Sequence, residues 1–282
     1  RAIAKISSAG ENAETSLTIQ RSGGKESLLN GVSTSLDQLR TRFPVLVFLP
    51  DRLAVVKGGP SVRRTYFDRM LGRIRPKLAG LPSEYALALN QRGAALRRVR
   101  DGFVSRDAIE PWTEAVARLG QELDVARADL VAQINPHFDR ICRTLGLTEA
   151  EISYRLSEIS IAVLEERCAR DIDRGTTGIG PHLLDISLKT EVGDLRSFGS
   201  QGQQRSAVLA LLLAEAACLT EQGRPPTLLL DDVLSELDRD RCTSLVALLE
   251  EQTQALVTAT DYDKAFDPAC VVEVKPGIAR VV

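Results

Sequence analysis

The sequence predicts an α/β protein in which a long helical lobe interrupts a fold built on a parallel sheet. Three observations support this prediction. Residues 45–49 and 227–230 are continuous apolar runs of the length that buried strands need. Across residues 61–146, apolar side chains recur at spacings of three and four, as in amphipathic helices. After residue 200 the pattern alternates between helix and strand, which favours parallel strands joined by helices.

The first part, residues 1–60, is expected to contribute strands to the sheet-containing lobe. Residues 1–7 and 16–21 alternate between polar and apolar side chains, and residues 27–29 could return as the second strand of a hairpin. A short helix is predicted at residues 36–42, directly before the apolar run.

The helical lobe is expected to span residues 61–146. Pro60 suits the first turn of its first helix. A second helix is predicted over about residues 82–100, and a third over about 111–146 with a bend at Pro136. Helices of 20 to 30 residues reach roughly 30–45 Å. We therefore expect this lobe to project from the sheet.

The last part, residues 147–282, is expected to complete the sheet-containing lobe. Strand patterns at residues 151–157 and 183–189 flank a helical pattern at 162–173. Beyond them we predict helices at 203–220 and 239–251, and strands at 227–230, 255–260 and 271–274.

Composition indicates a globular cytoplasmic protein without a membrane partner. The chain has 282 residues, of which 44% are apolar and 26% charged. Its five cysteines are widely spread and form no Cys-x-x-Cys pair, so free thiols in a reducing cytosol are the simplest interpretation. No charged and apolar leader begins the sequence. The longest apolar run, residues 208–219, contains Glu215 and is too short to span a bilayer.

Two carboxylates follow the apolar run at residues 227–230. A buried parallel strand delivers the residues after it to the carboxyl edge of the sheet, where ligands bind in such folds. Asp231 is therefore expected to hold Mg²⁺, directly or through water. Asp232 is expected to orient or polarise an attacking water molecule. The alternative is that both aspartates only cap the following turn.

Two further segments add to this pattern. Residues 235–238 read Ser-Glu-Leu-Asp, so Ser235 and Asp238 could lie beside the nucleotide, while Asp238 could also cap the next helix. Before the strand, a polar loop begins a helix whose free N–H groups suit a phosphate. The residues of this loop are Ser200, Gln201, Gly202, Gln203 and Gln204.

Loop, Asp-Asp strand and Ser-Glu-Leu-Asp turn in this order are typical of an ABC-type ATPase head, with a sheet like that of P-loop NTPases. The loop would contact ATP bound by a second copy. No Gly-x-x-x-x-Gly-Lys-Ser/Thr phosphate loop occurs in the sequence. The chain given is therefore expected to lack the segment that cradles ATP.

Two other features could contact a ligand. His182, in the Gly-Pro-His turn at residues 180–182, could face nucleotide or DNA, or could serve only a turn at the start of a strand. Residues 63–106 carry eleven Lys or Arg against three acidic residues. This concentration of positive charge could bind DNA phosphates. Alternatively, basic residues near a helix C-terminus could be there only because they interact favourably with the helix dipole. The candidate DNA-binding residues are Arg92, Arg97, Arg98 and Arg100.

Several blocks together resemble the RecF family, bacterial recombination mediators related to the heads of SMC and Rad50 proteins. The matching blocks are residues 48–64, 67–68, 180–182, 199–205, 229–233 and 235–238. In the terms of that family, residues 199–205 are similar to the signature loop, Asp231 and Asp232 to the Walker B pair, and Ser235 to Asp238 to the D-loop.

The resemblance implies a mechanism. Two copies would bind ATP and Mg²⁺ head to tail, and slow hydrolysis would release the homodimer. The dimer would bind single-stranded and gapped DNA in replication, recombinational repair and the SOS response, and help load recombinase with RecR and RecO. Two alternatives remain: a nucleotide-binding subunit of an ABC-type transporter, and a non-catalytic interaction fragment.

Overall fold

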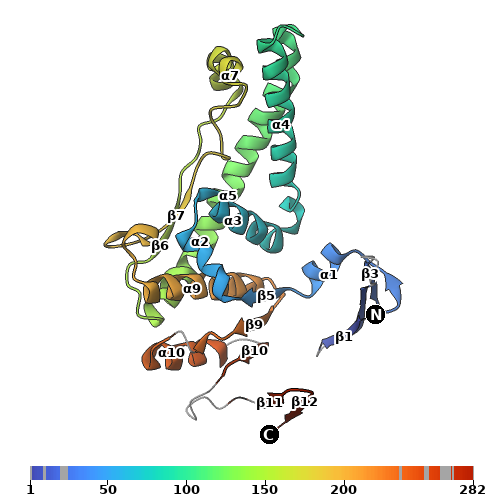
Figure 1. The fold of residues 1–282 in the computed structure, drawn as a ribbon, viewed down its shortest axis with the longest axis vertical. Coiled ribbons are helices and arrows are strands. Elements are labelled where there is room, and N and C mark those ends of the chain that lie inside the picture. Colours follow the sequence, from blue (N-terminus) through green and yellow to red (C-terminus); the bar gives the residue numbers. More distant parts are fainter. Residues whose placement is uncertain are drawn as a thin grey trace.

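The computed structural model describes residues 2–8, 11–19, 25–234, 237–250, 254–260, 268 and 270–281. Figure 1 shows a base, in which a small sheet lies beside helices, and a long arm that rises from it. We use "arm" for helices α4 (Leu81–Arg100), α5 (Glu110–Thr144), α6 (Ile161–Glu166) and α7 (Cys168–Arg174) with residues 175–182. We use "base" for the parallel sheet with α9 (Gln201–Glu221) and α10 (Arg239–Glu250).

The base is organised around a parallel sheet with strand order β10–β9–β5. Its strands are Gln254–Thr258, Thr227–Asp231 and Val45–Phe48. Leu228 and Leu230 of the central strand are almost completely buried. Helix α9 (Gln201–Glu221) buries most of its side chains in the same core, and α10 (Arg239–Glu250) follows the central strand. The predicted α/β class with parallel strands is confirmed.

The N-terminal strands form a sheet of their own, in which β2 and β3 are the two strands of the predicted hairpin. Four antiparallel strands lie in the order β1–β2–β3–β4. They span Ala2–Ser8, Glu11–Ile19, Lys25–Leu29 and Val32–Ser33. Each strand pairs with its neighbour in sequence, because short turns favour antiparallel hairpins over distant parallel partners. Helix α1 (Leu36–Arg42) then begins with a capping box between Ser35 and Gln38.

The last strands also lie outside the parallel sheet. Residues 271–274 were expected to be a single final strand, but β11 (Val272–Lys275) pairs antiparallel with β12 (Ile278–Val281). Pro276 and Gly277 connect them, and Gly277 has a φ of 78°, as the third position of a type II turn requires. This local turn accounts for the hairpin.

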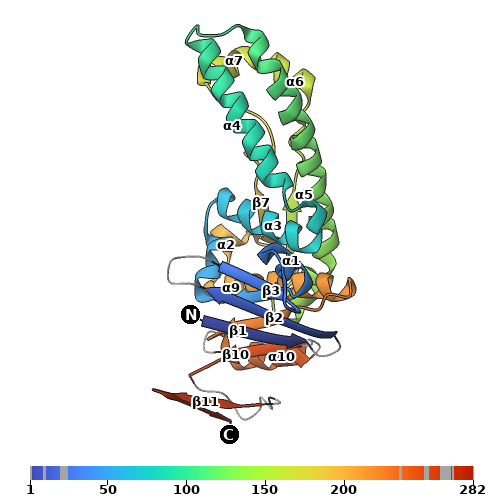
Figure 2. The same ribbon diagram turned by 90° about the vertical axis from the view of Figure 1, so that its right-hand side faces the viewer.

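Three long helices match the sequence prediction, and two of them, α4 and α5, belong to the arm. Helices α3 (Pro60–Ile74), α4 (Leu81–Arg100) and α5 (Glu110–Thr144) each have a proline in the first turn. The 35 residues of α5 correspond to about 50 Å. Its lower end packs on α9, so one helix joins the core of the base to the far end of the arm (Figure 2).

The arm extends beyond the predicted boundary at residue 146. After β6 (Glu151–Tyr154) the chain climbs back as α6 (Ile161–Glu166) and α7 (Cys168–Arg174), which pack on α5 and α4. It then descends to β7 (Ile186–Thr190), the antiparallel partner of β6. These helices are too short to be stable alone, and packing on α4 and α5 provides their core.

The remaining short elements complete the chain. They are α2 (Ala54–Lys57), β8 (Gly193–Asp194), α8 (Leu195–Phe198), and 3-10 turns at Pro50–Leu53, Pro76–Leu78 and Arg106–Ile109.

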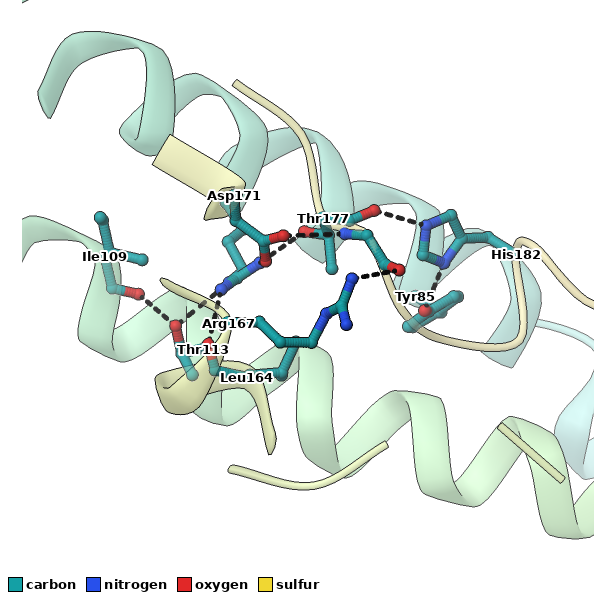
Figure 3. A network of polar contacts seen from close by, with 10 residues as sticks. Tyr85, Ile109, Thr113, Leu164, Arg167, Asp171, Thr177 and His182 are labelled. Atoms are coloured by element: carbon teal, nitrogen blue, oxygen red, sulfur yellow. Dashed lines mark hydrogen bonds and ion pairs between the residues drawn. The ribbon is translucent and has the colours of Figure 1, made fainter. Parts of the chain in front are cut away.

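A buried polar network, which we call the clasp, holds α7 against α4. Arg92 of α4 has no exposed surface and donates to Asp171 and Thr177, both at 2.7 Å. Its Nε donates to Thr113 of α5 at 3.2 Å. The second oxygen of Asp171 accepts the backbone N–H of Gly178 at 3.1 Å. Figure 3 shows Asp171, Thr113 and Thr177 converging at this point.

Asp171→Ala is expected to lower the free energy of unfolding by about 3–5 kcal/mol, because it leaves the Arg92 cation buried without its counter-charge. Urea unfolding measures this loss. The control is Asp139→Ala, which breaks the solvent-exposed i,i+4 pair with Arg143 and is expected to cost less than about 1 kcal/mol. Equal losses in both variants would contradict the role of the clasp.

Candidate functional site

Asp231 lies where the central strand β9 reaches the carboxyl edge of the parallel sheet. Its side chain is exposed, and one carboxylate oxygen accepts the hydroxyl of Thr258 at 2.6 Å. Thr258 ends the neighbouring strand β10, directly opposite Asp231 in the register. An exposed carboxylate that a neighbouring hydroxyl orients is a suitable Mg²⁺ ligand.

Asp232 leaves the strand in a left-handed conformation, with a φ of 49°. Aspartate adopts this conformation more readily than most residues. Its backbone N–H donates to both the carbonyl and the hydroxyl oxygen of Thr258, each at 3.1 Å. Thr258 therefore fixes the geometry of both aspartates. Sequence reasoning missed this residue, although its position at the end of an expected neighbouring strand was a usable signal.

The polar loop before α9 lies toward the same edge of the sheet. Helix α9 ends at Glu221 and the chain enters β9 at Thr227 after a short turn, so helix and strand run in opposite directions. The start of α9 therefore lies toward the end of β9 that carries Asp231. This direction agrees with the predicted arrangement, in which the loop and the carboxylates lie at one edge.

The loop forms a capping box at the start of α9. Ser200 Oγ accepts the N–H of Gln203 at 3.2 Å, and Gln203 Oε1 accepts the N–H of Ser200 at 2.8 Å. In these contacts the Ser200 oxygen is an acceptor, so its hydroxyl proton can still be donated to a ligand. Ser200 and Gln201 are exposed, as residues that meet a partner must be.

Gln204 does not fit the predicted role in nucleotide binding, and this is a correction. Its side chain is buried and donates to the carbonyl of Leu195 at 2.9 Å. The reason is helical geometry: the fourth residue of the helix turns toward the core, while Ser200 and Gln201 face outward. Through this bond Gln204 instead holds the start of α9 against α8.

Arg241 joins the loop to the segment after the Asp-Asp strand. A Cβ atom at Gly202 would lie 2.9 Å from Nη1 of Arg241, so the absence of a side chain at Gly202 makes room for this guanidinium. Arg241 pairs with Asp238 at 3.0 Å and donates to the carbonyl of Leu145 at 3.1 Å. Asp238 also accepts the backbone N–H of Arg241, as a helix cap does. Ser235 lies outside the described residues.

Arg241 was not among the predicted residues. Gly202 was expected to let a ligand approach, but its open side is filled by a side chain of the same protein. The contact shows that the start of α9 and the start of α10 meet. Because a whole helix and a strand separate these two positions in the chain, no local sequence pattern could have revealed their contact.

His182 lies in the arm, at the end of the segment that descends from α7, where it contacts α4. Its Nε2 is 3.2 Å from the carbonyl of Thr177, and its Nδ1 is 2.9 Å from the hydroxyl of Tyr85 (Figure 3). The carbonyl accepts the Nε2–H, so Nδ1 can accept the tyrosine hydroxyl, and the neutral ring is fully satisfied. Burial lowers the pKa of His182, and the bond to Thr177 opposes this only in part. These contacts give His182 a role in holding the arm together.

The four arginines proposed for DNA divide into two groups. Arg92 is wholly buried in the clasp and cannot reach a phosphate, which corrects that prediction. Arg97, Arg98 and Arg100 are exposed at the far end of α4 and remain candidates. The helical period explains the division, because Arg92 and Leu96 point toward α5 and α7 while the others face solvent.

The described residues contain no group of three or more His, Cys, Asp or Glu side chains placed to hold a metal ion. Magnesium at a nucleotide needs only one or two carboxylates, with phosphates and water completing its shell, so Asp231 alone fits. None of the helices in this described part combines the length and the apolar character that spanning a bilayer requires.

No model of a known protein family matches the chain. Curated relatives do. DNA replication and repair protein RecF of Heliobacterium modesticaldum is 38% identical over 237 residues, which cover 79% of this chain and 64% of that protein. The protein of the same name from Geobacter sulfurreducens is 34% identical over 272 residues, which cover 91% of this chain and 73% of the relative. The chain thus spans about two thirds to three quarters of these relatives.

Solved structures agree on the fold. The recombination mediator protein RecF in complex with ATP matches with a TM-score of 0.83 at 24% identity, covering 99% of this chain and 79% of that one. The Smc head domain with an extended coiled coil from Pyrococcus furiosus matches with a TM-score of 0.52 at 16% identity, covering 97% and 72%. The predicted head fold with an inserted helical lobe is confirmed.

Because the pKa of His182 is lowered in the folded state, its contribution to stability is complete above its ordinary value of about 6.5. It is lost as the pH falls toward the folded pKa, since the unfolded chain then binds the proton more readily. In His182→Gln, the free energy of unfolding is expected to fall less than in wild type as the pH drops from about 7.5 to about 5.5. Urea titrations at each pH measure this difference. Identical slopes in wild type and His182→Gln would contradict the assignment.

Proposed function

The chain belongs to the RecF family of DNA replication and repair proteins, and we propose that it acts as an ATP-dependent, dimerising DNA-binding switch. The observation that carries the proposal is the shared edge of the base. Ser200 begins the helix at this edge, Asp231 and Asp232 end its central strand, and Arg241 links the two segments.

In this proposal each side chain has a defined task. Asp231 holds Mg²⁺ beside the phosphates, directly or through water, with Thr258 fixing its carboxylate. Asp232 orients the water that attacks the terminal phosphate. Ser200 donates its hydroxyl, and the first turn of α9 its unpaired N–H groups, to ATP bound by a second copy. Magnesium supplies charge neutralisation at the phosphates when bound.

The contacts at the start of α9 explain why this surface suits nucleotide held by another copy. Ser200 and Gln201 are exposed and face away from the core, while Gln204 and Arg241 secure the loop from behind. A rigid loop of donors loses little entropy on binding. ATP would then join two protomers, and slow hydrolysis would separate them.

The relatives suggest the proposed protein partners, and the exposed arginines of the arm suggest the contact with DNA. Related solved structures are described as recombination mediators in the RecFOR pathway, which supports RecO and RecR as partners. Exposed Arg97, Arg98 and Arg100 would bind the phosphates of single-stranded or gapped DNA. We place this activity in the cytoplasm, where the switch would help recombinase load at gaps. The alternative of a transporter subunit is overturned by the RecF relatives.

Asp232→Asn in the full-length protein is expected to trap an ATP-bound dimer, because the amide orients water poorly but leaves the strand intact. Light scattering after ATP addition measures the lifetime of the dimer, which should lengthen at least about tenfold if hydrolysis controls release. Asp240→Asn, on the exposed first turn of α10, is the control. Dissociation at the wild-type rate in Asp232→Asn would count against the role of this residue.

Ser200→Arg is expected to abolish ATP-driven dimerisation while ATP binding by each protomer persists, since a bulky cation would fill the surface that meets the second copy. Sedimentation and nucleotide-binding assays separate the two effects. Ser35→Arg is a matched control, because Ser35 forms the same capping box with Gln38 on α1. Both variants lose about 1 kcal/mol of capping energy. If both also lose dimerisation, or if Ser200→Arg loses ATP binding as well, the assignment fails.

A further inference from the structure

A short turn at the far end of the arm is surrounded by arginine side chains from two helices. Residues 175–178 read Gly-Thr-Thr-Gly and leave α7. Arg97 of α4 donates to the carbonyl of Gly175 at 3.1 Å. Arg167, which directly precedes α7, donates to the carbonyl of Gly178 at 3.2 Å. Guanidinium groups thus bind both ends of the turn.

Two more arginines approach the same turn. A Cβ atom at Gly175 would lie 2.7 Å from Cγ of Arg97 and 3.1 Å from Nη1 of Arg100. A Cβ atom at Gly178 would lie 3.0 Å from Nη2 of Arg167 and 3.8 Å from Nη1 of Arg174. Gly175, with a φ of 68°, also closes α7 in the left-handed conformation that glycine favours. We call these four arginines, Arg97, Arg100, Arg167 and Arg174, the tip cluster.

The carboxylates near the tip cluster do not neutralise it. Asp171 is buried and already pairs with Arg92, and Asp101 pairs with Arg100 at 3.0 Å. Among the described residues, no carboxylate lies within ion-pair distance of the other three cluster members. Those three are Arg97, Arg167 and Arg174. Within the described residues, Arg97 and Arg167 bond only to carbonyl oxygens, which carry no net charge, so no ion pair compensates these two guanidinium groups.

The side chains are also available to a ligand. Arg97, Arg100 and Arg174 are exposed, and Thr176 at the middle of the turn is exposed beside them. Several guanidinium groups around a small, accessible turn are suited to phosphate oxygens, which accept paired N–H donors.

We infer that the tip cluster binds the phosphodiester backbone of DNA, with α7 supplying half of a surface that α4 alone does not complete. This inference rests on the proposed function and deepens it by placing a second helix in the DNA contact. Contacts to phosphate carry no sequence information, so the surface would bind DNA of any sequence, with an affinity that falls as salt rises.

The clasp explains how two segments distant in the chain can form one surface. Arg92 and Asp171 are 79 positions apart, and their buried pair holds α7 on α4. Asp171 also fixes the turn through the N–H of Gly178. The backbone positions that carry the tip cluster are therefore set before DNA arrives, so binding orders only side chains.

The test compares Arg174→Glu with two other variants of the full-length protein. Arg174 forms no hydrogen bond or ion pair within the part of the chain that the structure describes, so its reversal should not unfold the arm. Arg118→Glu is the matched control, because Arg118 is an exposed arm arginine on α5 with a carboxylate neighbour, Glu122. The third variant replaces Arg97, Arg98 and Arg100 with Glu. Fluorescence anisotropy measures the affinity for a gapped duplex between about 50 and 200 mM salt, the range in which phosphate contacts are resolved.

Arg174→Glu is expected to weaken binding about tenfold at the lowest salt and to reduce the slope of log affinity against log salt by about 1. Arg118→Glu should stay within about twofold of wild type, and ATP-dependent dimerisation should be unchanged in both. Arg174→Gln should give a smaller loss in the same direction, which supports the inference if the glutamate variant folds poorly.

Two results would overturn the inference. If only the α4 variant loses DNA binding, α7 is outside the DNA contact, while the proposed function stands. If no variant loses DNA binding, the arm contributes no DNA contact at all, and an acidic protein surface becomes the alternative partner of the tip cluster. Loss of ATP-driven dimerisation in the Ser200 variant is read separately, so failure of the switch and failure of the tip cluster are distinguishable.

Discussion

The pairing of Glu215 with Arg73 is the interaction on which the arrangement of base and arm depends. Glu215 lies in the middle of α9, almost fully buried, and its carboxylate is held by Nε and Nη2 of Arg73 on α3, the second contact at 2.9 Å. Burial opposes the charge of Arg73, but the carboxylate outweighs it and raises the pKa of the guanidinium. Helix α9 is thereby fixed to α3, the helix that precedes the arm in the chain.

Further arginines continue this connection along the arm. Asp68 of α3 binds Arg127 of α5 through two bonds of 2.8 and 2.9 Å, and Arg127 also donates to the carbonyl of Pro181. Pro181 precedes His182, which contacts Tyr85 of α4. Each bond is charge-assisted or buried, so the base and the arm are joined by contacts that resist bending. A rigid connection suits the proposed function, in which the nucleotide edge and the DNA-contacting arm keep a fixed geometry.

The sequence by itself determined much of the fold and the core of the site. Apolar spacing predicted α3, α4 and α5 to within a few residues, and apolar runs predicted β5 and β9, because local patterns report which face of an element is buried. The order of loop, strand and Asp-Asp pair predicted that Ser200 and Asp231 lie toward one edge, and the opposite directions of α9 and β9 agree with this.

Only the tertiary structure decided which polar residues are buried and which segments meet. Arg92 and Arg97 look alike in sequence, yet the first is enclosed by α7 and the second is exposed, because α7 returns to the arm from a distant part of the chain. Arg241 and Thr258 reached the site in the same way, through contacts between elements distant in the chain. A local pattern reports periodicity and cannot report such contacts, so the clasp and the tip cluster became visible only in three dimensions.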